Sequence, residues 1–78
     1  MSNILNGVEI LQSQLKFLTS KVEQIERDIR SMQRANCDDY SIAYTMDNEM
    51  YQLSQLYDNV NKAYVELCDS CKYESKNS

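Results

Sequence analysis

The sequence predicts an all-α protein: two long helices that form an antiparallel coiled-coil hairpin and associate further into an oligomer. Three observations predict this fold. The 78 residues contain no Pro and one Gly, and because these residues mark turns and strand ends, a many-stranded β fold is excluded. Apolar residues recur at alternating steps of three and four along most of the chain. A short run of poor helix formers interrupts the pattern near the middle.

The first helix is expected over about residues 4–35. From Ile4 to Met32 the apolar residues follow one heptad repeat, which fills positions a and d. The flanking positions hold polar residues such as Gln12 and Lys21, so the apolar stripe is narrow. The stripe of this half consists of Val8, Leu11, Leu15, Leu18, Val22, Ile25, Ile29 and Met32.

The second helix is expected over about residues 42–72 and continues the same repeat. Its stripe is wider, because Ile42, Leu56 and Ala63 occupy position g beside it. The stripe of this half consists of Met46, Met50, Leu53, Tyr57, Val60, Tyr64 and Leu67. Together the two stripes form one seam, which we expect to be both the core and the oligomer interface.

Residues 36–41 are expected to form the turn of the hairpin, within a single domain that covers residues 1–78. The alternative is a continuous helix in a parallel coiled-coil rod, because the heptad frame runs through this segment unbroken, with Asn36 at a. Against the rod, Asp39 at d would be a buried charge without a partner. The polar residues 73–78 are expected to fray.

Charge is unevenly distributed along the chain. Residues 1–35 have a net charge of +1 and residues 36–78 have −5, which gives −4 in total. An acidic chain of this kind is a poor nucleic-acid binder, and the sequence lacks an apolar run long enough for membrane insertion. With no signal-peptide pattern and an odd number of cysteines, a soluble protein of the reducing cytoplasm is expected.

Residues for catalysis or metal binding are scarce. Cys68 and Cys71 form a CxxC pair, but the chain has no His and Cys37 is its only other thiol. A structural zinc site needs four such ligands, so the pair is interpreted as structural. No enzyme activity, cofactor, metal or small-molecule substrate is expected.

Two exposed surfaces are candidates for binding. Tyrosine is common at protein contacts, and the second half offers a candidate partner surface of Tyr44, Tyr51, Val65, Asp47 and Glu49. The first half offers a basic stripe of Arg27, Arg30 and Arg34. This stripe is a candidate contact for an anion or an acidic partner.

The expected function is therefore protein binding. The partners would be other copies of the chain or another helical protein, with the chain acting as a scaffold, assembly factor or chaperone-like adaptor. The chain resembles scaffolds, assembly factors and adaptors of this kind in its architecture alone. The alternative is a small acidic inhibitor of viral or phage type, which sequesters a protein through its tyrosine-rich second half.

Overall fold

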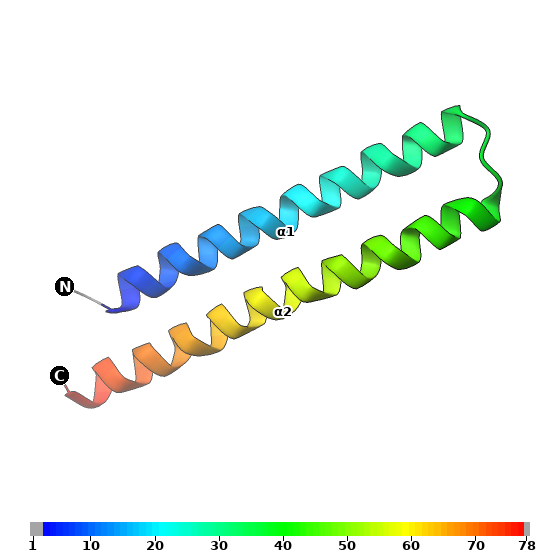
Figure 1. Ribbon diagram of the computed structural model, residues 1–78. Coiled ribbons are helices and arrows are strands. Elements are labelled where there is room, and N and C mark those ends of the chain that lie inside the picture. The colour runs from blue at the N-terminus through cyan, green and yellow to red at the C-terminus, as the bar shows by residue number, and fades with distance from the viewer. Residues whose placement is uncertain (1–2, 78) are drawn as a thin grey trace.

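The computed structural model describes residues 3–77, and the side chains of residues 3–75. It contains α1, Asn3–Arg34, and α2, Asp39–Asn77. The helices run antiparallel as a hairpin of 60 × 16 × 10 Å, with the two ends of the chain at the same end of the molecule (Figure 1). The hairpin expected from the sequence is confirmed, and the continuous rod is excluded.

The turn between the helices is shorter than expected. It spans residues 35–38 rather than 36–41, and Asn36 adopts the left-handed conformation with φ of 59°. The Asn36 amide donates to the Gln33 carbonyl and the Cys37 amide to the Met32 carbonyl, both at 3.0 Å. These are the two bonds of a Schellman cap, in which Asn can replace the usual Gly.

Asp38 begins α2 as its N-cap residue. Its Oδ1 accepts a hydrogen bond of 2.8 Å from the Ser41 amide, while its carbonyl accepts the first helical bond from the Ile42 amide. An acidic residue at the start of a helix also faces the positive end of the helix dipole. Helix α2 therefore starts at Asp39, three residues earlier than predicted.

Replacing Asp38 with Ala is expected to lower the melting temperature, whereas Asp38→Asn, which retains a capping oxygen, should have little effect at neutral pH. Hydrogen bonds from Ser41 lower the pKa of the Asp38 carboxyl below its ordinary 3.8. The contribution of the cap is thus present above that value and disappears as the pH falls through the lowered pKa. Circular dichroism melts of both variants across acidic pH test this. Equal melting temperatures for Asp38→Ala and the parent chain at pH 7 would contradict the capping role.

The far end of α2 also differs from expectation. Residues 73–77, expected to fray, are helical through Asn77, and Ser78 lies outside the described residues. Glu and Lys are good helix formers, and this segment contains neither Gly nor Pro to stop the helix. Helix α1 matches the expected 4–35 to within one residue at either end.

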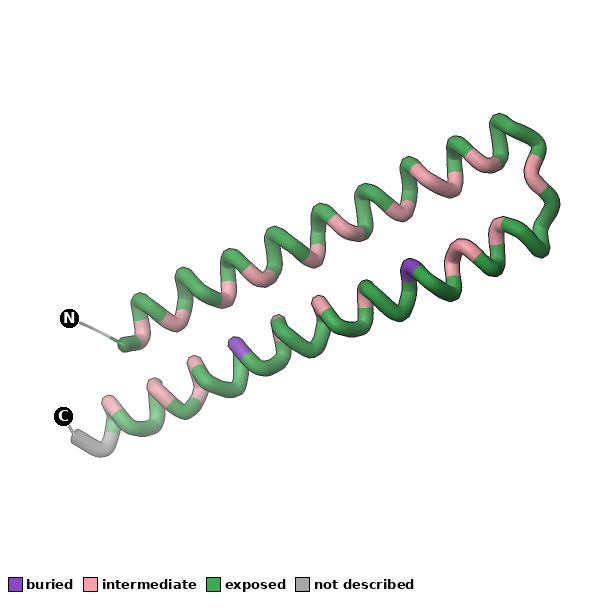
Figure 2. The backbone as a smooth tube through the Cα atoms, in the orientation of Figure 1, coloured by how far each residue is buried: buried purple, intermediate pink, exposed green. Residues whose placement is uncertain are grey.

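The two helices contact each other through heptad positions d and g. The less exposed residues of each helix face the other helix, and the outer sides are exposed (Figure 2). Among the described residues only Ala63 and Glu49, both at g on α2, are buried, with 5 % and 8 % of their surface exposed. Most d residues, including Leu18, Leu53 and Val60, are only half-buried. One hairpin therefore covers only part of its apolar surface.

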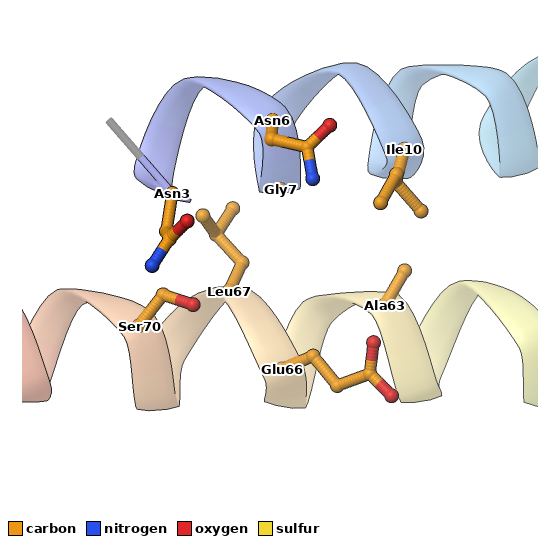
Figure 3. A pocket seen from close by; sticks show the side chains of 8 residues that line it. All are labelled: Asn3, Asn6, Gly7, Ile10, Ala63, Glu66, Leu67 and Ser70. Atoms are coloured by element: carbon orange, nitrogen blue, oxygen red, sulfur yellow. The ribbon is translucent and has the colours of Figure 1, made fainter. Parts of the chain in front are cut away.

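Near the open end of the hairpin the two helices approach each other closely at Gly7. A side chain on Gly7 would begin 2.9 Å from Leu67 Cδ1 and 3.7 Å from Leu67 Cα, so the missing side chain lets α2 come near (Figure 3). Beside this contact is a small hollow, whose edge includes Asn3, Asn6 and Ser70. The contact fixes one end of the register between the helices.

Candidate interaction surface

The predicted seam is divided between an inner and an outer part. The d residues lie between the helices, but the a residues lie mostly on one open face of the hairpin. Val22 on α1 is 51 % exposed, and Tyr57 and Tyr64 on α2, expected to be core, are 63 % and 57 % exposed. The exposed a residues with large apolar side chains are Val8, Leu15, Val22, Met50, Tyr57 and Tyr64.

These side chains border an apolar groove between the helices, which we define by Leu15, Val22, Met50, Tyr57 and Tyr64. The groove contains two hollows, which meet at Tyr57. Half-buried d residues form the floor: Leu18 and Leu53 in the hollow beside Val22, Leu11 and Val60 in the hollow beside Leu15. The groove thus continues along the middle of the hairpin as one apolar surface.

The groove is flanked at position e by uncharged residues on both helices, and one charged residue, Asp58, borders the hollow beside Val22. The neighbouring e positions hold Gln12 and Thr19 on α1, and Ser54 and Asn61 on α2, all exposed. A hydrogen bond with Cys68, together with the electrostatic interaction with the same side chain, raises the pKa of the Tyr64 phenol. Tyr64 therefore stays neutral, and apart from Asp58 the groove presents apolar and neutral polar groups.

The opposite face of the hairpin has a different character. On α2 its exposed c positions are the polar residues Gln52, Asn59 and Glu66 and, near the end of the helix, Tyr73; on α1 Ile10 and Phe17 are the two large apolar ones. Ile10 borders the hollow at the open end, and Phe17 is 58 % exposed. Of these two faces, the one with the groove has large apolar residues of both helices lining shared hollows, and it is the better candidate for binding.

A polar cluster lies along the helix contact, from the buried Glu49 to the exposed Gln52. Glu49, assigned above to an exposed partner surface, is 8 % exposed and packs toward α1, so that assignment is wrong. Its Oε2 atom is buried without a hydrogen-bond partner. Nearby, Lys21 Nζ donates a 2.5 Å hydrogen bond to Gln52 Oε1. The cluster links α1 to α2 through charged and amide groups instead of apolar ones.

Glu49 has a perturbed pKa for reasons found within this cluster. A hydrogen bond with Asp28, burial and repulsion by the Asp28 charge all raise the pKa of Glu49, and attraction to Lys21 partly opposes them. Two carboxylates side by side in a contact cannot both ionise without repulsion. The contact between α1 and α2 is therefore sensitive to pH at this point.

The remaining members of the candidate partner surface stay exposed. Tyr44, Tyr51 and Val65 lie at b on the outer side of α2, and Asp47 is exposed at e. On α1, Arg27, Arg30 and Arg34 are also exposed. Arg30 forms a 3.7 Å ion pair with Glu26 of the same helix. An exposed pair of this kind contributes little to stability.

The cysteines are free thiols: Cys37 and Cys68 are half-buried and Cys71 is exposed. Across the part of the chain that the structure describes, no group of His, Cys, Asp and Glu side chains could hold a metal ion. Neither helix, over its described residues, is apolar enough for long enough to cross a lipid bilayer. Comparisons with protein-family models, curated proteins and solved structures gave no match.

Proposed function

We propose that this protein is a non-catalytic helical interaction module, which binds a helix of another polypeptide in its apolar groove. The observation that carries this proposal is the exposure of the a residues on both helices. Val22 and Tyr57 belong to a regular heptad stripe, yet more than half of each is exposed. Contiguous exposed apolar surface between polar edges is typical of a protein-binding site.

The shape of the groove supports a helical partner. Two parallel rows of side chains, one from each helix, flank a floor of leucine and valine, as in grooves that accept an amphipathic helix. Tyr57 and Tyr64 supply large contact areas, and their hydroxyl groups can remain hydrated at the edge. A stripe repeating every three or four residues matches the ridges of another helix.

A photo-crosslinking amino acid at Tyr57 tests the proposal in cells that produce the chain. We expect discrete protein adducts from this position, because a bound helix would cover it. The same amino acid at Phe17, equally exposed but on the opposite face, should yield none. The Tyr57 adducts should also disappear when Val22→Asp places a charge in the groove. Adducts that form equally at both positions, or that survive Val22→Asp, would refute the groove as the binding site, as would a lack of adducts at Tyr57.

A further inference from the structure

We infer that the groove binds a second copy of this chain, face to face, so that α1 of each copy packs against α2 of the other in a four-helix bundle. This inference rests on the proposed function and specifies its partner. Four helices arranged this way are antiparallel to both neighbours. Each helix contacts one neighbour through d and g and the other through a and e.

The exposed area of the hairpin is large enough for such a dimer. The chain exposes 6243 Å², whereas a compact folded monomer of 9.1 kDa is expected to expose about 4,900 Å². The excess is about 1,300 Å² per copy, and a standard interface removes about 800 Å² from each partner. A face-to-face dimer of long hairpins can therefore cover the groove and bring the exposed area toward that of a compact protein.

The groove is also suited to contact with a copy of itself. In a twofold dimer the same patch meets itself, so any net charge on the patch would be repelled. The flanking e residues Gln12, Thr19, Ser54 and Asn61 are uncharged, so this cost is absent at the e positions beside the groove. These four e positions are neutral although the chain as a whole carries −4.

Charge further selects the arrangement of the two copies. Residues 36–78, which contain α2, carry −5, and residues 1–35, which contain α1, carry +1. Packing α2 on α2 of the second copy would bring the two acidic helices together. Packing α1 on α2 of the second copy avoids that repulsion and adds attraction.

One pair of charges makes this arrangement specific. Two contacts define the register of the helices: Gly7 lies across from Leu67, and Lys21 is hydrogen-bonded to Gln52. In this register Lys16 is level with Asp58. Lys16 borders a separate hollow on α1, formed with Gln12, Leu15 and Thr19, and Asp58 borders the groove on α2. When α1 covers α2 of the second copy at the same level, Lys16 of one copy faces Asp58 of the other, twice per dimer.

Light scattering across a dilution series, together with charge reversal, tests the inference. We expect a particle of twice the 9.1 kDa chain mass, which Val22→Asp dissociates. Lys16→Glu and Asp58→Lys should each weaken the homodimer about tenfold, because each reversal creates two repulsive pairs. Mixing these two variants should restore association, since both cross-pairs in the mixed dimer are attractive. Lys62→Glu, on the outer side of α2, is the matched control and should leave the dimer intact.

A chain that remains monomeric at every concentration would overturn the second copy as occupant. A dimer that Val22→Asp does not dissociate would also overturn it. The same holds if mixing Lys16→Glu with Asp58→Lys does not restore association. The proposed function is tested separately by the adducts at Tyr57. Adducts with a different protein, formed by a monomeric chain, would leave the interaction module standing and refute only the self-association.

Discussion

Truncating Leu18 to Ala is expected to lower the free energy of unfolding by about 2 kcal/mol. Leu18 occupies a d position between the helices and forms part of the groove floor. Removing a buried leucine side chain typically costs 2–5 kcal/mol, and the lower end applies because Leu18 is only half-buried. Few domains exceed 15 kcal/mol in total stability, so this is a large loss for so small a core. Denaturant titration followed by far-UV circular dichroism measures it.

The matched control for Leu18→Ala is Phe17→Ala, at the neighbouring residue. Phe17 is the larger side chain but lies exposed on the opposite face of α1. Its truncation should change the free energy of unfolding by less than about 0.5 kcal/mol. If the two substitutions had equal effects, the helices would not be packed through the d positions as described.

Replacing Glu49 with Gln is expected to stabilise the hairpin at pH 7 by about 1 kcal/mol, because a buried carboxylate with an unpaired oxygen is replaced by a neutral amide. The raised pKa of Glu49 sets the direction of the pH effect. The favourable contribution of Glu49 to the stability of the hairpin is present in full below the ordinary Glu pKa of 4.5. That contribution is lost as the pH rises through the raised value and the repulsion from Asp28 develops.

Denaturant unfolding of the parent chain and of Glu49→Gln, measured from pH 4 to 7, follows this effect. The difference in stability between the two should grow toward neutral pH. Glu23→Gln is the control: it removes the same charge at an exposed position of α1 and should leave the pH profile unchanged. If Glu49→Gln and Glu23→Gln changed the pH dependence of stability equally, the effect would come from net charge rather than from the buried pair.

Several features of the fold are predictable from local sequence. The unbroken three-and-four spacing predicts both helices, and the structure contains them. The position of the turn is also predictable, but its form is not. Asn36 fits the heptad frame at a, which favours the rod, yet it adopts the left-handed conformation and ends α1. The signal that could have identified this role is the pair Asn36 and Asp38, a residue that tolerates positive φ followed by a strong N-cap.

The candidate site was less predictable, because it depends on how the helices face each other. Heptad spacing places Val22 and Leu18 on one stripe and cannot separate them. In the hairpin, Leu18 lies inside and Val22 outside. Glu49 shows the converse: a charged residue beside the stripe is expected in solvent, but the pairing of g positions buries it against Asp28 and Lys21.

The sequence by itself therefore determined two helices, their apolar stripe and the place where the chain reverses, because these depend on residue spacing and local capping. Only the tertiary structure decided which part of the stripe is covered. A two-helix contact can cover only one side of each helix, and the antiparallel pairing uses the side formed by d and g. The a residues of both helices are left together on one open face, and that face is the groove in which we place the function.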